Sequence, residues 1–413
     1  MPLRVDCQLL ATTMSLLCLA SAAASEGKLQ LLSGERFTAS LVRLSDGSAS
    51  FLRPESDARV QSMPLANVVK WGTPAEGERR PTLVLRQGSR LIAAPTWTRE
   101  GSLRYADGNF NLRQTLLDDV VMPRAMVELV LLEAARDPFL FDRVVRKAGA
   151  YRGGKDRIWL TNGDAFSGEL GTINSGRLEL TSEEQPLTFE LGSVVAVKLT
   201  GGAERGDPPA NVAIGMRDGG LLLASGAELS RGGTLRVSLT PELTLTGRRP
   251  GAVVMTQPLT GRVTYLSDLE PLDYRHTPYF DLGWAYGRDR DLLGRPLRSG
   301  GQPFLKGLSM HSGSRLVYRT PDGMTRFDGS LAVAGGSPAT DGARGSSVVG
   351  RVFVARGGKF EEVFVSQTVR EGDAPVAVSV DIEAAQAIAL VVEDAGDGDT
   401  RDHARWLDAR FVR

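Results

Sequence analysis

The sequence predicts an all-β protein in which small strand repeats precede a β-sandwich. The 413 residues include 47 glycines and 21 prolines, which supply many turns and favour short strands over long helices. Segments in which apolar and polar residues alternate recur along the whole chain. Alternation with a period of two half-buries a strand, so these segments predict strands.

Charge and composition exclude two classes of function. The chain carries 49 basic and 49 acidic residues and has no formal net charge. Proteins that bind nucleic acids usually carry a basic excess, so we expect no nucleic-acid partner. No segment outside the first two dozen residues approaches the run of about 18 apolar residues that a membrane helix needs. We therefore expect no membrane span.

Residues 1–24 have the pattern of a secretory signal peptide. Arg4 supplies a short basic region, residues 9–20 form an apolar run, and small residues follow up to a cleavage site before Ser25. Both cysteines lie in this segment, so the exported chain would have no disulfide, thiol nucleophile or thiolate metal site. We expect a protein that is secreted or lies in the periplasm or cell envelope.

One pattern recurs four times between residues 28 and 258. An apolar alternation ends at a glycine, a second glycine follows 13 or 14 residues later, and each copy closes on a pair of valines. Glycine tolerates the positive φ of tight turns, which explains its place between strands. The glycine pairs are Gly34 and Gly47, Gly88 and Gly101, Gly163 and Gly176, and either Gly219 or Gly220 with Gly233.

Each copy is predicted to be a meander of four or five short strands. Charged and glycine-rich linkers separate the copies and favour SH3-like or Sm-like barrels, single or paired, over one closed propeller. Residues 25–132 hold two copies, and residues 156–258 hold the other two. Residues 133–155 are predicted to form a short helical insert and linker. The repeats are expected to serve as a structural spacer or interaction scaffold.

The sequence pattern changes near residue 262. Aromatic residues become more frequent there, and segments of regular apolar and polar alternation follow. Residues 314–318, 350–354, 376–380 and 389–392 are the clearest of these strands. Alternating strands at this spacing, without a helical pattern, predict an antiparallel β-sandwich over residues 262–413.

Three segments of this sandwich carry a more specific pattern: Lys306-Gly307 to His311, residues 326–329 and residues 350–354. The first resembles the KG-x-x-x-H motif of the NPCBM/NEW2 family, and the other two are similar to later strands of that family. The segment from Glu393 to Trp406 resembles the DxGDG…DHxxW ending, although Arg405 stands where an acidic residue is more usual. The resemblance implies a galactose-binding-like jelly-roll module that binds carbohydrate and is often attached to glycoside hydrolases.

Sugar recognition needs aromatic faces for the pyranose ring and a few polar side chains for its hydroxyl groups. Trp284 and Tyr286 lie in a glycine-flanked loop and are the best candidates for exposed platforms. Trp406 lies in a terminal strand and is predicted to be a core residue. The candidate carbohydrate-binding residues are Trp284, Tyr286, His311, Arg315, Asp402 and His403.

The acidic run near the C-terminus is a candidate calcium site. Asp397, Asp399 and Asp402 offer the hard oxygen ligands that Ca²⁺ prefers. The run departs from the EF-hand pattern, because Asp402 occupies the position that needs glycine and Arg401 precedes it. The alternative is that these residues are turn residues whose carboxylates cap backbone amides. No other cofactor is expected.

Motifs of the common enzyme classes are absent from the sequence: there is no G-x-S-x-G, P-loop, H-E-x-x-H or strand-bound GxGxxG. Ser309 and His311 share a strand face, but a triad would need an acid as well. The sequence does not exclude a pair of carboxylates placed for glycoside hydrolysis. The sequence predicts a non-enzymatic, exported, glycan- or polysaccharide-binding protein. The alternatives are an extracellular scaffold that contacts envelope proteins through sheet edges, and a glycoside hydrolase or its accessory subunit.

Overall fold

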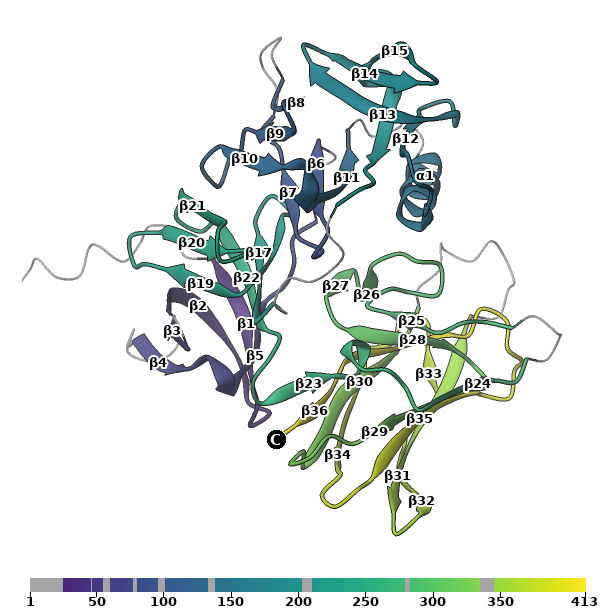
Figure 1. The fold of residues 1–413 in the computed structure, drawn as a ribbon. Helices are drawn as coiled ribbons and strands as arrows, with labels where there is room; N and C mark the ends of the chain where they lie inside the picture. Colours follow the sequence, from purple (N-terminus) through teal and green to yellow (C-terminus); the bar gives the residue numbers. More distant parts are fainter. Residues whose placement is uncertain are drawn as a thin grey trace, which may run out of the picture.

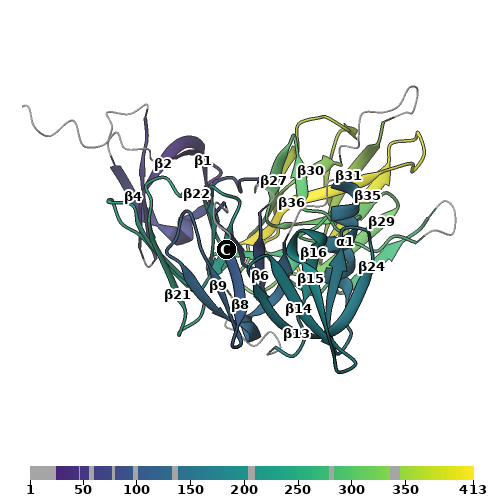
Figure 2. The same ribbon diagram turned by 90° about the horizontal axis from the view of Figure 1, so that it is seen from above.

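The computed structural model describes residues 25–45, 47–54, 60–76, 80–95, 101–132, 138–202, 210–278, 283–334 and 345–413. The predicted signal peptide and both cysteines lie outside the described residues. The all-β class is confirmed: strands dominate, and one α-helix, α1 (Pro138–Ala150), is described within the predicted insert. No helix of the described residues is long and apolar enough to cross a membrane. A strand array and a sandwich lie side by side (Figures 1 and 2).

The four predicted copies are the four units of the strand array. The first contains β1 (Glu26–Leu31), β2 (Arg36–Ser45), β3 (Ser48–Leu52), β4 (Val60–Pro64), the 3-10 turn η1 (Leu65–Asn67) and β5 (Val68–Gly72). The second contains β6 (Thr82–Leu85), β7 (Arg90–Ile92), β8 (Leu103–Ala106), β9 (Asn109–Leu112), β10 (Val120–Pro123), η2 (Arg124–Met126) and β11 (Val127–Leu131). The third contains β12 (Asp156–Leu160), β13 (Ala165–Asn174), β14 (Arg177–Ser182), β15 (Gln185–Glu190), η3 (Leu191–Ser193) and β16 (Val194–Lys198). The fourth contains β17 (Val212–Met216), β18 (Leu221–Ala224), β19 (Gly226–Leu229), β20 (Thr234–Ser238), β21 (Thr244–Arg248) and β22 (Val253–Pro258).

The glycines of the repeat have the backbone conformation that the sequence predicts. The first glycine of each copy has φ of 93°, 101°, 95° and 92°, and the second has φ of 72°, 73°, 80° and 79°. In the fourth copy the turn glycine is Gly219, because Gly219 has the positive φ of the set. The repeated glycines therefore mark equivalent turns.

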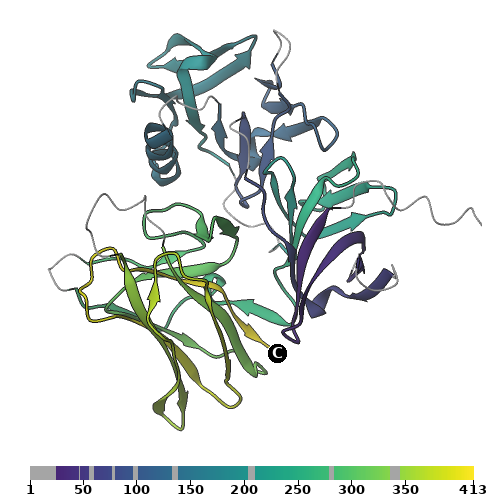
Figure 3. The same cartoon turned by 180° about the vertical axis from the view of Figure 1, so that it is seen from behind.

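The copies are joined in pairs through their edges. Within each copy the first strand pairs with the last, and β5 also pairs with β22 while β11 pairs with β16. The first copy therefore joins the fourth, and the second joins the third, as Figures 1 and 3 show. The described residues contain no closed barrel: all four copies share one 22-stranded sheet and one hydrophobic core. If each copy were an independent barrel, it would have to close its own strand edges. In this array a neighbouring copy covers those edges instead.

A buried carboxylate ties the second and third copies together. Asp156 is 1% exposed and accepts hydrogen bonds from the Arg124 guanidinium (2.8 Å), the Leu170 amide (2.9 Å) and the Thr200 amide (2.9 Å). The Thr200 hydroxyl donates a further bond to Asp156 at 3.1 Å. The carboxylate therefore neutralises a cation and satisfies two backbone amides, of which the Leu170 amide is buried.

The sandwich consists of two sheets that face a common core. One has the order β25 (Gly287–Arg288), β28 (Gly307–His311), β36 (His403–Val412), β30 (Arg326–Val333) and β34 (Val376–Asp381), with β23 (Val263–Tyr265) on β36. The other has the order β24 (Asp273–His276), β29 (Ser314–Arg319), β35 (Ala387–Asp394), β31 (Ser347–Arg356) and β32 (Lys359–Val365), with β33 (Val369–Arg370) on β31. The turn η4 (Leu266–Asp268) and the hairpin of β26 (Leu297–Ser299) and β27 (Gln302–Phe304) complete it. Trp406 is wholly buried in this core, as predicted.

The two bodies are joined by a packed interface. Tyr265 of β23 is wholly buried and packs with Leu32 and Val69 of the first copy. The Gln257 amide donates a hydrogen bond of 2.9 Å to the Tyr265 hydroxyl. Lys70 forms an ion pair with Asp408 across the same interface. Apolar packing, a buried hydrogen bond and an ion pair thus fix the sandwich against the array.

We predict that Asp156→Ala lowers the free energy of unfolding by about 3–5 kcal/mol, because it leaves a part-buried guanidinium and two backbone amides, one of them buried, without their acceptor. Urea denaturation followed by circular dichroism measures the loss. Asp164→Ala is the matched control, since Asp164 is exposed and contacts only its own turn. A loss below about 1 kcal/mol for Asp156→Ala would contradict this role of the carboxylate.

Candidate functional site

The three histidines of the chain converge at one end of the sandwich. His311 ends β28 and His403 begins β36, and these two residues lie directly opposite each other in one sheet. His276 ends β24 in the other sheet. The ring centroid of His311 lies 5.5 Å from those of both His276 and His403. The site therefore lies where strand ends of both sheets meet.

Trp284 lies among these histidines, in the loop between β24 and β25. Its ring stacks on His311 at a centroid distance of 5.3 Å with an interplanar angle of 4°. His403 meets the same ring edge-on at 5.1 Å. Trp284 is half-buried, so the residue keeps some contact with solvent. Trp284, His276, His311 and His403 are called the Trp–His cluster below.

Two hydrogen bonds hold the tryptophan loop in place. The Trp284 amide donates to His276 Nδ1 at 3.0 Å, and the Tyr274 hydroxyl donates to the Trp284 carbonyl at 2.5 Å. Because Nδ1 of His276 accepts a hydrogen bond, its neutral ring carries hydrogen on Nε2. That Nε2 is buried and has no hydrogen-bond partner among the described residues. The cluster therefore holds a buried donor that a ligand or water can satisfy.

Burial sets the protonation of the cluster. Burial and the neighbouring His311 lower the pKa of His403 to about 4. Burial also lowers the pKa of His311, against the opposing effects of the Ser312 carbonyl and Asp399. Both rings are therefore neutral at pH 7 and present one donor and one acceptor each. Neutral imidazoles suit the recognition of uncharged hydroxyl groups.

Asp402 lies next to His403 and is 1% exposed. Its Oδ1 accepts a hydrogen bond of 3.1 Å from the Ser347 amide, and the Ser312 hydroxyl stabilises the carboxylate as well. Burial raises the pKa of Asp402 to about 6, and the carboxylates of Asp397 and Asp394 act in the same direction. This carboxyl is a second buried polar group at the site.

Two predicted residues lie apart from the cluster. Tyr286 packs against Tyr274 at 5.0 Å and accepts a hydrogen bond of 3.0 Å from Arg288. Arg315 forms an exposed ion pair with Asp273 at 2.6 Å. Trp284, His311 and His403 are brought together, and Asp402 lies beside them. His276 was not among the predicted site residues. Two signals could have indicated it: the chain has few histidines, and His276 lies at the end of a strand.

The acidic run has capping roles in the structure. Asp397 accepts hydrogen bonds from the Ser347 hydroxyl at 2.8 Å, and Asp394 accepts one from the Gly396 amide at 2.8 Å. Asp399 contributes its carbonyl to the Asp402 amide at 3.3 Å. Across the described residues, no three His, Cys, Asp or Glu side chains are grouped so that they could hold a metal ion. The turn-capping alternative accounts for these contacts, and the calcium site stays a prediction.

Ser309 and Arg405 are structural in this arrangement. The Ser309 hydroxyl is buried and donates to the Arg290 carbonyl at 2.8 Å, while His311 Nδ1 faces Ser312. A Ser309–His311 pair therefore does not form. Arg405 lies 3.4 Å from Asp291 in a buried ion pair, which explains how a cation replaces the acidic residue more usual in the resembled family.

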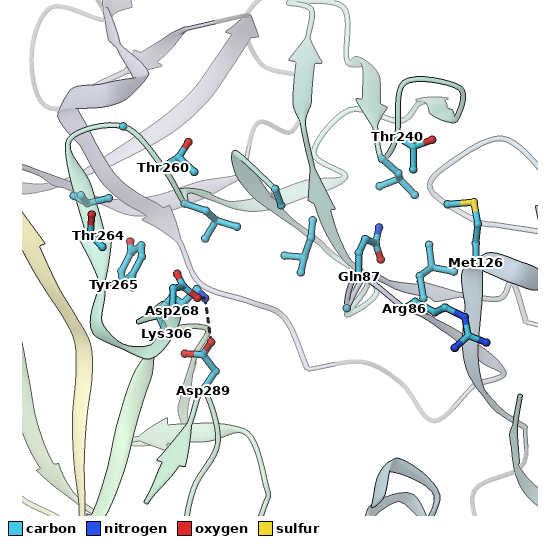
Figure 4. A pocket seen from close by; sticks show the side chains of 18 of the residues that line it. Arg86, Gln87, Met126, Thr240, Thr260, Thr264, Tyr265, Asp268, Asp289 and Lys306 are labelled. Carbon is cyan, nitrogen blue, oxygen red and sulfur yellow. Dashed lines mark hydrogen bonds and ion pairs between the residues drawn. The ribbon is translucent and has the colours of Figure 1, made fainter. Parts of the chain in front are cut away.

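A cavity of about 900 Å³ lies between the array and the sandwich (Figure 4). Burial alone would lower the pKa of Lys306, but the adjacent Asp289 and Asp268 outweigh it and raise that pKa. Most of the cavity's polar groups already have partners within the chain. These bonds are Lys306 to Asp268 (2.5 Å) and Asp289 (3.0 Å), Gln257 to Tyr265 (2.9 Å), Gln87 to Ser89 (3.0 Å), Thr240 to Glu242 (3.2 Å) and Thr260 to Asn211 (3.1 Å). The cavity is therefore lined mainly by groups that already have partners, and the Trp–His cluster contains a buried ring nitrogen, His276 Nε2, that has none among the described residues.

Two sheets around one core, with aromatic and histidine side chains gathered at strand ends, define a β-sandwich module. Residues 262–412 match the model of the NPCBM/NEW2 domain, so the family resemblance over this part of the chain is confirmed. No curated protein matches the sequence.

Several solved structures are similar to the chain. CBM51 of Clostridium perfringens GH95, in complex with methyl-galactose, is 23% identical over 36% of this chain and 99% of its own, with a TM-score of 0.30. CBM51-2 with GlcNAc and the INT domains of C. perfringens ZmpB is 21% identical over 60% and 43%, with a TM-score of 0.31. The tandem CBM51 modules of Sp3GH98 from Streptococcus pneumoniae SP3-BS71 are 15% identical over 88% and 87%, with a TM-score of 0.31. Similarity this low adds no argument about the ligand.

We predict that His403 makes the protein less stable in acid. The pKa of His403 is lowered from 6.5 to about 4 in the folded chain, so the unfolded chain binds more protons between these values. Stability then falls as pH drops from about 6.5 towards 4, by at most about 1.4 kcal/mol per pH unit for one proton. Thermal unfolding of His403→Gln should show a shallower fall, and an unchanged slope would contradict the assignment.

We predict that Asp402→Asn changes the pH dependence of stability in the direction opposite to that of His403→Gln. The folded pKa of about 6 lies above the ordinary 3.8, so the stability that Asp402 contributes is present in acid and lost as pH rises through about 6. The amide that replaces the carboxyl does not titrate, so we expect the variant to gain stability over the parent at pH 7.5 and to lose that gain at pH 4. A pH-independent difference would contradict the raised pKa.

Proposed function

We propose that the chain is an exported, non-enzymatic protein that binds carbohydrate through the Trp–His cluster of its C-terminal module. The observation that carries the proposal is the partly exposed Trp284 next to His276 Nε2, a buried donor without a partner among the described residues, within a domain whose family is named for carbohydrate binding. The signal-peptide pattern supports placement in the periplasm, in the cell envelope or outside the cell.

Each residue has a distinct role in this proposal. The indole of Trp284 packs against the apolar C–H face of a sugar ring, while His311 backs its other face. His276 Nε2 is the donor available for a sugar hydroxyl or for a water that bridges to it. Satisfying a buried polar group recovers its desolvation cost, about 1–3 kcal/mol, so this donor favours a hydroxyl-bearing ligand over an apolar one. Contact is shallow, and affinity per site is expected to be weak.

The scaffold alternative draws on a different observation, the unpaired edge of β32, which is treated in the next subsection. The hydrolase alternative would need two carboxylates about 5–5.5 Å or 6.5–9.5 Å apart at a sugar site. At the Trp–His cluster, Asp402 is buried and Asp397 is held by Ser347. The cluster thus supports binding better than glycoside hydrolysis.

We predict that Trp284→Ala lowers glycan affinity at least tenfold, because it removes the stacking surface; loss of one aromatic contact of about 1.4 kcal/mol is a factor of ten. The full chain is screened at pH 7.5 against an array of neutral polysaccharides and oligosaccharides, and hits are quantified by isothermal titration calorimetry. Arg315→Ala is the matched control and should bind like the parent, since Arg315 pairs with Asp273 away from the cluster.

Equal binding by Trp284→Ala and the parent would show that a different surface binds the sugar. An effect of Arg315→Ala alone would move the site to the outer face of the sheet. Silence across the array with a folded protein would favour the scaffold alternative. Titrations with calcium and with a chelator test the predicted calcium site, because a calcium requirement would assign the acidic run a metal-binding role.

A further inference from the structure

β32 is an edge strand that the described residues leave uncovered. It ends one sheet of the sandwich, and six of its seven residues are exposed. Phe360, Val363 and Val365 are 51%, 36% and 49% exposed. The β31–β32 hairpin lies at the end of the sandwich away from the array (Figures 1 and 3). An open edge presents backbone N–H and C=O groups to which another strand can pair.

The apolar surface continues from this edge onto the outer face of the sheet. Phe360 lies opposite Ala355 on β31, and Ala355 belongs to a cluster with Val317, Ala389 and Phe353. These side chains face away from the main core. A strand added to β32 would therefore find apolar side chains beside it on this face, and alternating apolar residues would suit it.

The centre of β32 carries two acidic residues. Glu361 and Glu362 are consecutive and so point to opposite faces of the sheet. Glu362 shares the Arg351 guanidinium with Glu393, at 2.7 Å from each. Glu361 has no ion-pair partner among the described residues. Like charges opposite each other on paired strands are destabilising, so an added strand needs cations at this point.

These charges disfavour pairing of β32 with a second copy of itself. Directly opposite residues of antiparallel strands share a face, so a two-fold pairing must be centred on one residue. Centres at Glu361 or Glu362 place identical carboxylates together. A centre at Phe360 leaves a three-residue ladder, because Gly357 and Gly358 turn with φ of 58° and 79°. A centre at Phe364 is equally short, and a centre at Val363 falls on the β-bulge of the hairpin.

We propose that β32 is a docking edge for an extended segment of another protein, with two consecutive Lys or Arg residues flanked by alternating apolar residues. Backbone pairing supplies the affinity, and the basic pair opposite Glu361 and Glu362 sets the register and specificity. This inference is independent of carbohydrate binding, because the Trp–His cluster lies on β24, β28 and β36.

Two fluorescent peptides test the proposal. Both alternate Thr and Val over about nine residues, and one has Lys-Lys at its centre where the other has Glu-Glu. Fluorescence anisotropy with the full chain in low salt should show binding of the lysine peptide only, weakening as salt screens the exposed charges. Glu361→Lys should lose at least tenfold in affinity for the lysine peptide and gain affinity for the glutamate peptide.

The reversal of preference is a readout that a merely damaged fold would not give. Glu169→Lys is the matched control, an exposed strand glutamate of the array opposite Thr181, and it should bind like the parent. Val365→Thr should weaken binding without altering charge preference. Failure of both peptides to bind at millimolar concentration, or indifference to Glu361→Lys, would overturn the proposal. Sedimentation that reveals a dimer dispersed by Glu361→Lys would assign the edge to a second copy and overturn it as well.

Discussion

The C-terminal module depends on the backbone pairing of one strand, β36. It pairs with β23, β28 and β30, so three other strands are positioned by it. Along its length β36 carries His403 in the cluster, Trp406 in the core and Asp408 at the interface with the array. Because these side chains belong to ten consecutive residues, the site, the core and the interface hold fixed positions relative to one another.

A bulge in β36 explains how one strand serves both the core and the interface. The pairing register with β30 shifts between Asp328 and Ser330, and Asp408 has a positive φ of 49° at this point. A bulge re-aims a side chain that regular alternation would direct elsewhere. Here it allows Asp408 to meet Lys70 of the first copy. Arg410 beyond the bulge pairs with Asp328 at 3.2 Å, so the neighbouring buried charges are also neutralised.

Local features of the chain were predictable from sequence, and long-range pairings were not. The repeat glycines, the helix of the insert and the core position of Trp406 follow from local pattern. The joining of the first copy to the fourth was not predicted, because alternation specifies a strand but not its neighbour. The histidines were found singly as candidates or overlooked, since their convergence depends on which strand ends meet. Arg315 was chosen for its chemistry, but its strand position directs it to Asp273.

The cavity between the array and the sandwich and the Trp–His cluster differ in what they offer a polar ligand. Most polar groups that line the cavity have partners within the chain, such as Lys306 with Asp268 and Thr240 with Glu242, so a ligand there would have to displace existing bonds. At the Trp–His cluster, His276 Nε2 is buried without a partner among the described residues. Such a group costs the fold about 1–3 kcal/mol unless water or a ligand satisfies it. A hydroxyl-rich ligand at the Trp–His cluster would therefore satisfy a group that has no partner among the described residues, whereas a ligand in the cavity would compete with existing bonds.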